Sequence, residues 1–382
     1  MNQAYIIDAV RSPTGKRKGG LSHVHGADLG AHVIRAIVER NGIPDEDYED
    51  VIFGCVDTVG PLAGNIARTC WLAAGLSQSV PGVTIDRQCG SSQQAVHFAA
   101  QAIMSGTMDV VLAGGVQTMT QIPISSAMTL ATPLGFTDPF SGSAGWVDRY
   151  GPIPPTQFNG AQMIADQWGF SRRDLEEYAF ESHRRALQAM SEGRFDKEIV
   201  PIAGVKMDET ARDTSLEKMA ELDIIFGCDK ITAAVSSQTC DGSSAVLLVS
   251  EDALKRYDLT PRARIHHMSV RGEDPIRMLS APIPATDYAM KKSGMSLDDI
   301  DLVEINEAFA PVPMAWLKET GFPHEKTNVS GGAIALGHPL GATGTKLMTT
   351  LLHELERRGA RFGLQTMCEG GGQANVTIIE RL

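Results

Sequence analysis

The chain lacks long hydrophobic runs and a surplus of basic residues. No uninterrupted apolar stretch approaches the ~18 residues of a membrane-spanning helix, so we expect no membrane span. The net charge of −12 at pH 7 argues against nucleic acid as a general partner, because such binding needs a basic face. This net charge does not exclude a local basic patch that binds an anionic ligand.

Clustered cysteines are also missing. The six cysteines form no Cys-x-x-Cys pair, and residues 1–20 contain no apolar segment typical of a secretory signal. We therefore expect reduced thiols, a cytoplasmic location and no metal site, since zinc sites need clustered ligands. The cysteines are Cys55, Cys70, Cys89, Cys228, Cys240 and Cys368.

What is present is typical of a globular protein of more than one domain. The 382 residues are 43% hydrophobic and 21% charged, which is enough for two or three domains. Short apolar segments at 4–10, 51–54 and 108–115 predict strands, and they alternate with helical patterns at 29–41 and 91–105. This alternation predicts an α/β architecture with buried sheets.

An internal repeat indicates two similar halves. Residues 41–52 and 293–304 both read as a helix end, a glycine, an acidic turn and a strand. A helix followed by a strand also recurs after Cys89 and after His338. The order favours a duplication whose halves pack face to face.

The middle of the chain interrupts this pattern. Residues 133–155 are rich in glycine and proline and predict turns. A helix then begins after Ser171, where Asp174 three residues later completes a capping box.

Two thiols and one imidazole carry the chemistry. Cys89 stands before Gly90 at a predicted helix start, where the helix dipole favours a thiolate and hence a nucleophile. Cys368 follows an apolar strand and precedes three glycines, where a thiol can give and take a proton. His338 lies in Gly-His-Pro-Leu-Gly, whose glycines build no core. Read alone, either cysteine is equally compatible with a buried structural residue.

These motifs, together with Asn306-Glu307-Ala308-Phe309-Ala310 and the opening segment 8–16, resemble the thiolase family over nearly the whole chain. The resemblance implies two similar sheet-and-helix halves in a layered α/β/α/β/α arrangement. It places the N-terminal half at 1–119, with 231–260 returning to it, and the C-terminal half at 261–382. Residues 120–230 are then an inserted loop domain that covers the site and holds coenzyme A. The family also implies a homodimer or homotetramer.

The same resemblance implies a mechanism. Cys89 is the acylated nucleophile, activated by His338, and Cys368 carries the proton to and from carbon. Asn306 holds a water that forms one oxyanion hole with His338. The backbone N–H groups of Cys89 and Gly370 form the other.

Substrate contacts follow by position in the family pattern. Coenzyme A is a co-substrate, and no cofactor is expected to bind tightly. Gln157 and Phe158 stand where acetoacetyl-CoA thiolases usually carry His-Met. This difference favours an acyl group larger than four carbons. The residues expected at coenzyme A are Ser237, Arg212, Phe226, Ala308 and Phe309, and those at the acyl group are Gln157, Phe158 and Met163.

The predicted function is cleavage of a 3-ketoacyl-CoA by coenzyme A, giving acetyl-CoA and a shortened acyl-CoA in acyl-chain degradation. A biosynthetic acetoacetyl-CoA thiolase is the alternative, since the same site runs both directions. A ketoacyl-synthase type is disfavoured because the third catalytic position is Cys368. A non-catalytic acyl-CoA or lipid carrier on this fold would be expected to lose Cys89 or His338, and both are present.

Overall fold

The N-terminal half is an α/β unit built on five strands. The computed structural model describes residues 2–382. The strands run in the order β4-β3-β5-β6-β1, with β3 parallel to β4 and β5, and β6 antiparallel to β5 and β1. β6 arrives from beyond the middle of the chain. The elements are β1 (Tyr5–Arg11), α1 (Gly26–Asn41), β3 (Asp50–Gly54), α2 (Ile66–Ala73), β4 (Gly82–Ile85), α3 (Ser91–Ser105), β5 (Val110–Thr118) and β6 (Cys240–Val249), with the short β2 (Gly15–Lys16) beside β6.

The C-terminal half repeats this topology. Its strands run β7-β10-β9-β8, with β8 parallel to β9 and with β10 antiparallel to both β9 and β7. A parallel bridge between Val303 and Thr327 lies where β4 lies in the first half. The elements are β7 (Ala263–Gly272), α10 (Pro282–Ser293), β8 (Leu302–Ile305), α11 (Pro311–Thr320), α12 (Ala333–Leu336), α13 (Thr343–Arg358), β9 (Phe362–Glu369) and β10 (Gln373–Arg381). The duplication inferred from the sequence is therefore visible strand by strand.

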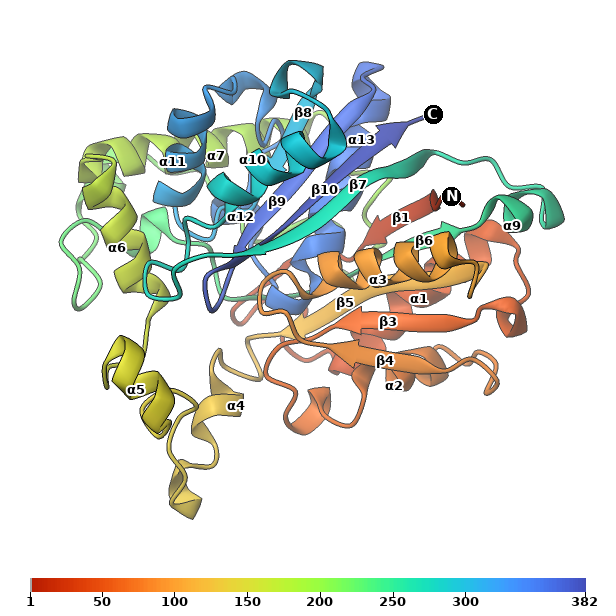
Figure 1. The fold of residues 1–382 in the computed structure, drawn as a ribbon, viewed down its shortest axis with the longest axis horizontal. Coiled ribbons are helices and arrows are strands. Elements are labelled where there is room, and N and C mark those ends of the chain that lie inside the picture. The colour runs from red at the N-terminus through yellow and green to blue at the C-terminus, as the bar shows by residue number, and fades with distance from the viewer. Residues whose placement is uncertain (1) are drawn as a thin grey trace.

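The layers follow from which helices each sheet contacts. α3 and α13 pack on each other and contact strands of both halves, so they form the middle layer. α1 and α2 cover the outer face of the first sheet, and α10 that of the second (Figure 1). The two sheets join at one edge, where Tyr5 and Ile6 of β1 pair with Arg264 and Ala263 of β7. Hydrogen bonds therefore connect all strands into one continuous sheet.

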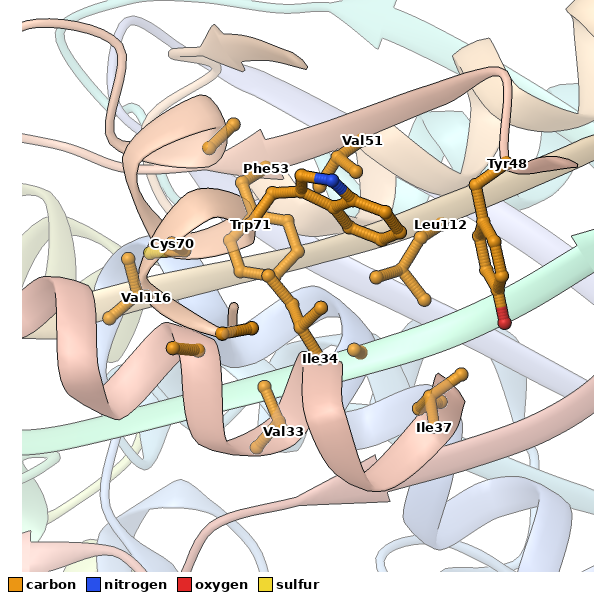
Figure 2. Packing of buried hydrophobic residues seen from close by; sticks show 14 of the residues in the cluster. Val33, Ile34, Ile37, Tyr48, Val51, Phe53, Cys70, Trp71, Leu112 and Val116 are labelled. Atoms are coloured by element: carbon orange, nitrogen blue, oxygen red, sulfur yellow. The ribbon is translucent and has the colours of Figure 1, made fainter. Parts of the chain in front are cut away.

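Apolar side chains fill each interlayer space. Between α1, α2 and the first sheet, the Trp71 indole lies among Phe53, Ile34 and Leu112, with Tyr48 beside it (Figure 2). The Trp71 ring centroid lies 5.3 Å from that of Tyr48, and its Nε1–H donates to the carbonyl of Ser77 at 2.8 Å. This packing gives the loops at the strand ends a rigid base.

The segment between β5 and β6 carries its own helices. Ser171 and Asp174 form the expected capping box at the start of α7. The stretch 133–155 differs from the turns predicted, because Ser143 caps a short helix within it. Figure 1 shows α4 and α5 at the lower left, apart from the two sheets. The helices are α4 (Ser126–Thr129), α5 (Ala144–Tyr150), α6 (Gln157–Gln167), α7 (Arg172–Ser191) and α8 (Leu216–Ala220), and α9 (Glu251–Arg256) follows β6.

Candidate active site

Cys89 lies in a tight turn between β4 and α3. Gln88 has a positive φ of 49°, and the Ser91 hydroxyl accepts from the Arg87 N–H at 2.9 Å and donates to the Gln88 carbonyl at 2.6 Å. Gly90 is the N-cap, so Cys89 immediately precedes the helix. The turn thus holds the half-buried thiol at the N-terminal end of α3.

The Cys89 thiol is not pre-ionised, contrary to the expectation from the helix dipole. Burial, and secondly the charge that Glu369 carries once it is ionised, raise its pKa to about 12. The backbone N–H groups of Cys89 and Gly370 oppose that rise. Both N–H groups therefore face the sulfur, but they do not outweigh burial.

Gly370 reaches this position because β9 and β10 turn tightly beside the Cys89 turn. A Cβ atom on Gly370 would lie 2.8 Å from Oε1 of Gln88. One on Gly90 would lie 2.0 Å from Oε1 of Glu369. Both glycines are needed for the two turns to touch.

Cys368 lies near the end of β9 and is completely buried. Burial raises the pKa of its thiol well above the ordinary value, and the neighbouring Cys89 and Glu369 add to the rise. The two thiols thus share one site although 278 residues separate them along the chain (368 − 89 − 1).

His338 is held in one tautomer. The Thr343 hydroxyl donates to the Pro339 carbonyl at 3.0 Å, so it accepts from Nδ1–H of His338, 2.6 Å away. This leaves a lone pair on Nε2, which lies 3.3 Å from Nδ2 of Asn306. Burial, and secondly Lys346, lower the pKa of His338 to about 3, so the imidazole is neutral at physiological pH and can accept a proton.

Asn306 follows β8 and is fixed by its N–H, which donates to the Thr366 carbonyl at 3.1 Å. Its Oδ1 is buried without a hydrogen-bond partner among residues 2–382. A buried amide beside an imidazole suits the water-holding role expected of it, because buried polar atoms normally acquire a partner.

Three side chains that support the site were missed or left without a role in the sequence. Oε1 of Gln117, at the end of β5, accepts from Val56 N–H at 2.9 Å and Gly341 N–H at 3.1 Å, so it ties the His338 loop to the first half. Thr343 fixes the tautomer of His338. Glu369 is buried beside both thiols. The signals available in the sequence were the hydroxyl of Thr343, five residues after His338, and the acid Glu369 next to Cys368.

The residues expected around coenzyme A fall into two groups. Ser237 N–H donates to the Ala308 carbonyl at 2.9 Å, and Ser236 and Phe309 form an antiparallel bridge. These residues therefore line one surface together. Arg212 and Phe226 are exposed, Phe226 completely, and within residues 2–382 no hydrogen bond joins them to that surface.

The residues expected at the acyl group lie on α6. The Phe158 ring packs edge-on against Phe309, with centroids 5.6 Å apart, so it adjoins the Ser237 surface. Gln157 is half-buried at the first residue of α6, and Met163 is 40% exposed.

No group of three or more His, Cys, Asp or Glu side chains suited to a metal ion occurs within residues 2–382. None of the helices over the same residues is both long and apolar enough to cross a membrane.

A duplicated α/β fold that brings two thiols together, with a neutral imidazole on the loop whose Leu340 packs against Cys89, is typical of acyltransferases that work through an acyl-cysteine. The thiolase N-terminal domain matches residues 4–252, and the thiolase C-terminal domain matches residues 259–381. The chain therefore belongs to the thiolase family.

Several named relatives align over the full chain. The steroid 3-ketoacyl-CoA thiolase FadA6 of Mycobacterium tuberculosis is 58% identical over 386 residues, covering 100% of this chain and 95% of the relative. A 3-ketoacyl-CoA thiolase of Yersinia pestis is 42% identical over 399 residues, and one of Aliivibrio fischeri is 38% identical over 398, each covering both chains completely.

Proposed function

We propose that this protein cleaves a 3-ketoacyl-CoA with coenzyme A, giving acetyl-CoA and an acyl-CoA two carbons shorter. The observation that carries the proposal is the placement of the Cys89 sulfur against the Gly370 N–H and beside Cys368. The degradative direction agrees with relatives named 3-ketoacyl-CoA thiolases.

In the first half-reaction, Nε2 of His338 takes the Cys89 proton as the sulfur attacks the 3-keto carbon. The N–H groups of Cys89 and Gly370 stabilise the oxyanion. The bond between C2 and C3 then breaks and leaves the acyl group on Cys89. The electron pair goes to the enolate of acetyl-CoA, whose oxygen is stabilised by the imidazolium and by the water held at Asn306.

Cys368 completes the proton balance and so links the first half-reaction to the second. Its thiol protonates C2 of the enolate, and acetyl-CoA leaves. The resulting thiolate takes the proton of the incoming coenzyme A. The coenzyme A sulfur attacks the acyl-enzyme, and the departing Cys89 regains its proton from His338.

The acyl-enzyme is the direct test. Incubation with acetyl-CoA should add one acetyl group at Cys89, detectable by mass spectrometry of the peptide. Cys89→Ala should lose this adduct and its turnover while retaining the wild-type melting temperature, because the residue is only half-buried. Turnover above about one percent in Cys89→Ala would assign the nucleophile elsewhere, and binding without acylation would indicate a carrier.

For the acyl group, we propose a substrate larger than acetoacetyl-CoA. An open groove of about 710 Å³ lies between α5 and residues 273–276, lined by Arg149, Tyr150, Glu273, Asp274, Pro275 and Ile276. It adjoins the catalytic turn, because Glu273 N–H donates to the Gly372 carbonyl at 2.6 Å. The relative at 58% identity carries a steroid substrate in its name.

Each additional buried methylene contributes about 0.8 kcal/mol, so the preference should reach one or two orders of magnitude in kcat/KM. Acetoacetyl-CoA, a linear long-chain and a polycyclic 3-ketoacyl-CoA should be compared. A kcat/KM for acetoacetyl-CoA equal to the larger substrates would favour the biosynthetic alternative.

The remaining assignments belong to the same proposal. The surface of Ser237, Ala308 and Phe309 holds the pantetheine arm, while Arg212 and Phe226 meet the nucleotide end at the exposed rim. Residues 120–230 act as the loop domain, and the enzyme works in the cytoplasm as a homo-oligomer.

A further inference from the structure

Lys346 is a buried cation beside the proposed base and has no role in the mechanism above. It lies on the first turn of α13 and is only 5% exposed. Its Nζ donates to the carbonyls of Leu336 and Gly337, at 3.0 Å for Gly337. These are the two residues immediately before His338.

The loop to which Lys346 donates these hydrogen bonds has a constrained backbone. Gly337 has a φ of +78°, and a Cβ there would lie 2.7 Å from Thr14 and 2.9 Å from the Cys240 sulfur. Thr343 holds the ring of His338 from the same helix, three residues before Lys346, which places both on one face of α13. A single helical turn therefore fixes the imidazole and the backbone leading to it.

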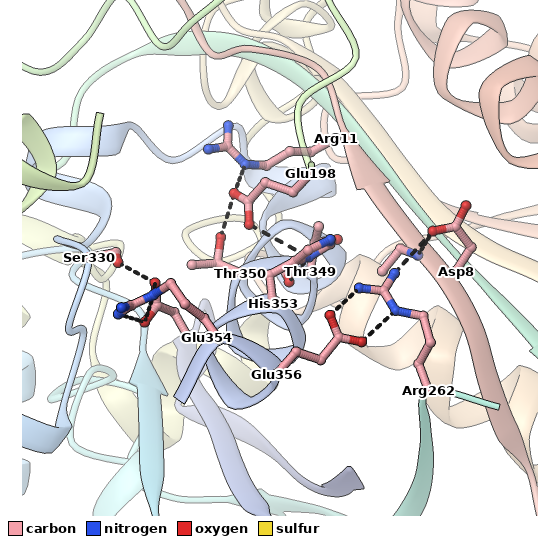
Figure 3. Close-up of polar contacts among 12 residues, drawn as sticks. Asp8, Arg11, Glu198, Arg262, Ser330, Thr349, Thr350, His353, Glu354 and Glu356 are labelled. Carbon is pink, nitrogen blue, oxygen red and sulfur yellow. Dashed lines mark hydrogen bonds and ion pairs between the residues drawn. The ribbon is translucent and has the colours of Figure 1, made fainter. Parts of the chain in front are cut away.

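The charges around Lys346 come from several elements. Asp208, from the inserted segment, accepts from both terminal nitrogens of Arg11 at 2.7 and 2.9 Å. Glu198 accepts from Nε of Arg11 at 2.6 Å and from the Thr350 hydroxyl at 3.0 Å (Figure 3). The titratable or charged groups that face Lys346 are Arg11, Glu198, Asp208, Cys240, Glu304 and His338.

We infer that Lys346 is a positioning residue for the base: its ammonium group holds the backbone before His338 and so fixes where the imidazole lies. The inference rests on the proposed function of His338. Burial lowers the pKa of Lys346 from 10.5 to about 8, against the pull of Asp208, so the ammonium is lost as the pH rises through about 8. Alkaline pH should therefore loosen the loop.

The test measures how the NMR signal of His338 responds when Lys346 loses its proton, so it does not rely on turnover. Wild-type protein labelled with [13C]histidine is titrated between about pH 6 and 10 by NMR, with His338→Asn assigning the resonance. The His338 signal should shift with a midpoint near 8, because Lys346 titrates beside it. The shift should disappear in Lys346→Met, and in Lys346→Arg it should be absent up to about pH 10, because a guanidinium stays charged over this range.

Kinetics supply the second readout. Lys346→Met should lower kcat at least about tenfold with KM little changed, and Lys346→Arg should restore part of the loss. Lys292→Met, at an exposed lysine of α10, is the matched control.

A flat His338 titration in the wild type, or a shift that persists in Lys346→Met, overturns the inference. If Lys346→Met does not fold, the His338 titrations of the wild type and of Lys346→Arg still test the inference. Failure of Cys89 acylation would refute the proposed function while leaving the titration result intact.

Discussion

At the scale of single residues, the site keeps its reacting groups neutral. Burial raises the pKa of both thiols and lowers that of His338. A preformed thiolate–imidazolium pair is therefore disfavoured, and the Cys89 proton moves as the sulfur attacks.

Cys368→Ser should separate the two half-reactions. A hydroxyl is similar in size but far less acidic, so proton transfer to carbon should slow about 10²–10⁴-fold. Acylation of Cys89 by acetyl-CoA should persist, because that step forms no carbanion. Mass spectrometry and steady-state thiolysis of the same preparation check both; near wild-type cleavage would remove Cys368 from its role.

Glu369 should make stability depend on pH. Burial raises its pKa from 4.5 to about 8, so folding favours the protonated acid. The folded state then holds a proton that the unfolded chain releases, and the free energy of unfolding should fall as pH rises from 4.5 to 8. The slope for one group is at most about 1.4 kcal/mol per pH unit.

Glu369→Gln should remove this dependence, because glutamine keeps the shape of the neutral acid but does not titrate. Urea unfolding at pH 5 and pH 8 should show a larger loss for the wild type than for the variant. Parallel losses in both proteins would mean that Glu369 is ionised in the folded state.

At the scale of elements, the site depends on how closely α3 and α13 approach. α3 follows Cys89, α13 follows His338, and Gly344 of α13 lies against the backbone of α3. A Cβ at Gly344 would lie 2.1 Å from the Gln93 nitrogen. The separation of nucleophile and base is thus set partly by a missing side chain.

Gly344→Ala should push the two helices apart. We expect a loss of about 1–3 kcal/mol in the free energy of unfolding, together with a fall in kcat. Gly145→Ala is the control, because Gly145 is helical and a Cβ there meets nothing within 4 Å. The control should be neutral or slightly stabilising. Equal effects of both substitutions would argue against tight helix contact.

At the scale of the whole molecule, the first sheet ends in an open edge. β4 is its outermost strand, and among residues 2–382 no strand pairs with its far side. Leu72, Val83 and Phe98 are each 40–41% exposed, on α2, β4 and α3. Because α2 and α3 pack against β4, these side chains accompany an edge suited to pairing with a second copy.

Val83→Lys should weaken that association. Size-exclusion chromatography with light scattering should show a homo-oligomer for the wild type and a shift toward monomer for the variant, because a charge would be buried in the interface. Met207→Lys, at an exposed methionine elsewhere, should leave the mass unchanged. A monomeric wild type would refute the proposed oligomer.

The sequence by itself determined the family, the order of the motifs and the duplicated architecture. Strand and helix periods are local properties, so the helix over 91–105 and the capping box at Ser171 were predictable. The short helix α5 was not, because its glycine and the surrounding prolines obscure the pattern.

Only the tertiary structure decided the electrostatics of the site and its supporting contacts. The helix start predicted an acidic Cys89, but burial and Glu369, which comes from a strand of the other half, reverse that shift. Likewise, nothing local to Phe226 indicates that it is completely exposed, or that Lys346 grips the His338 loop. A pKa and a contact depend on neighbours in space, and folding brings those neighbours from segments far apart in the chain.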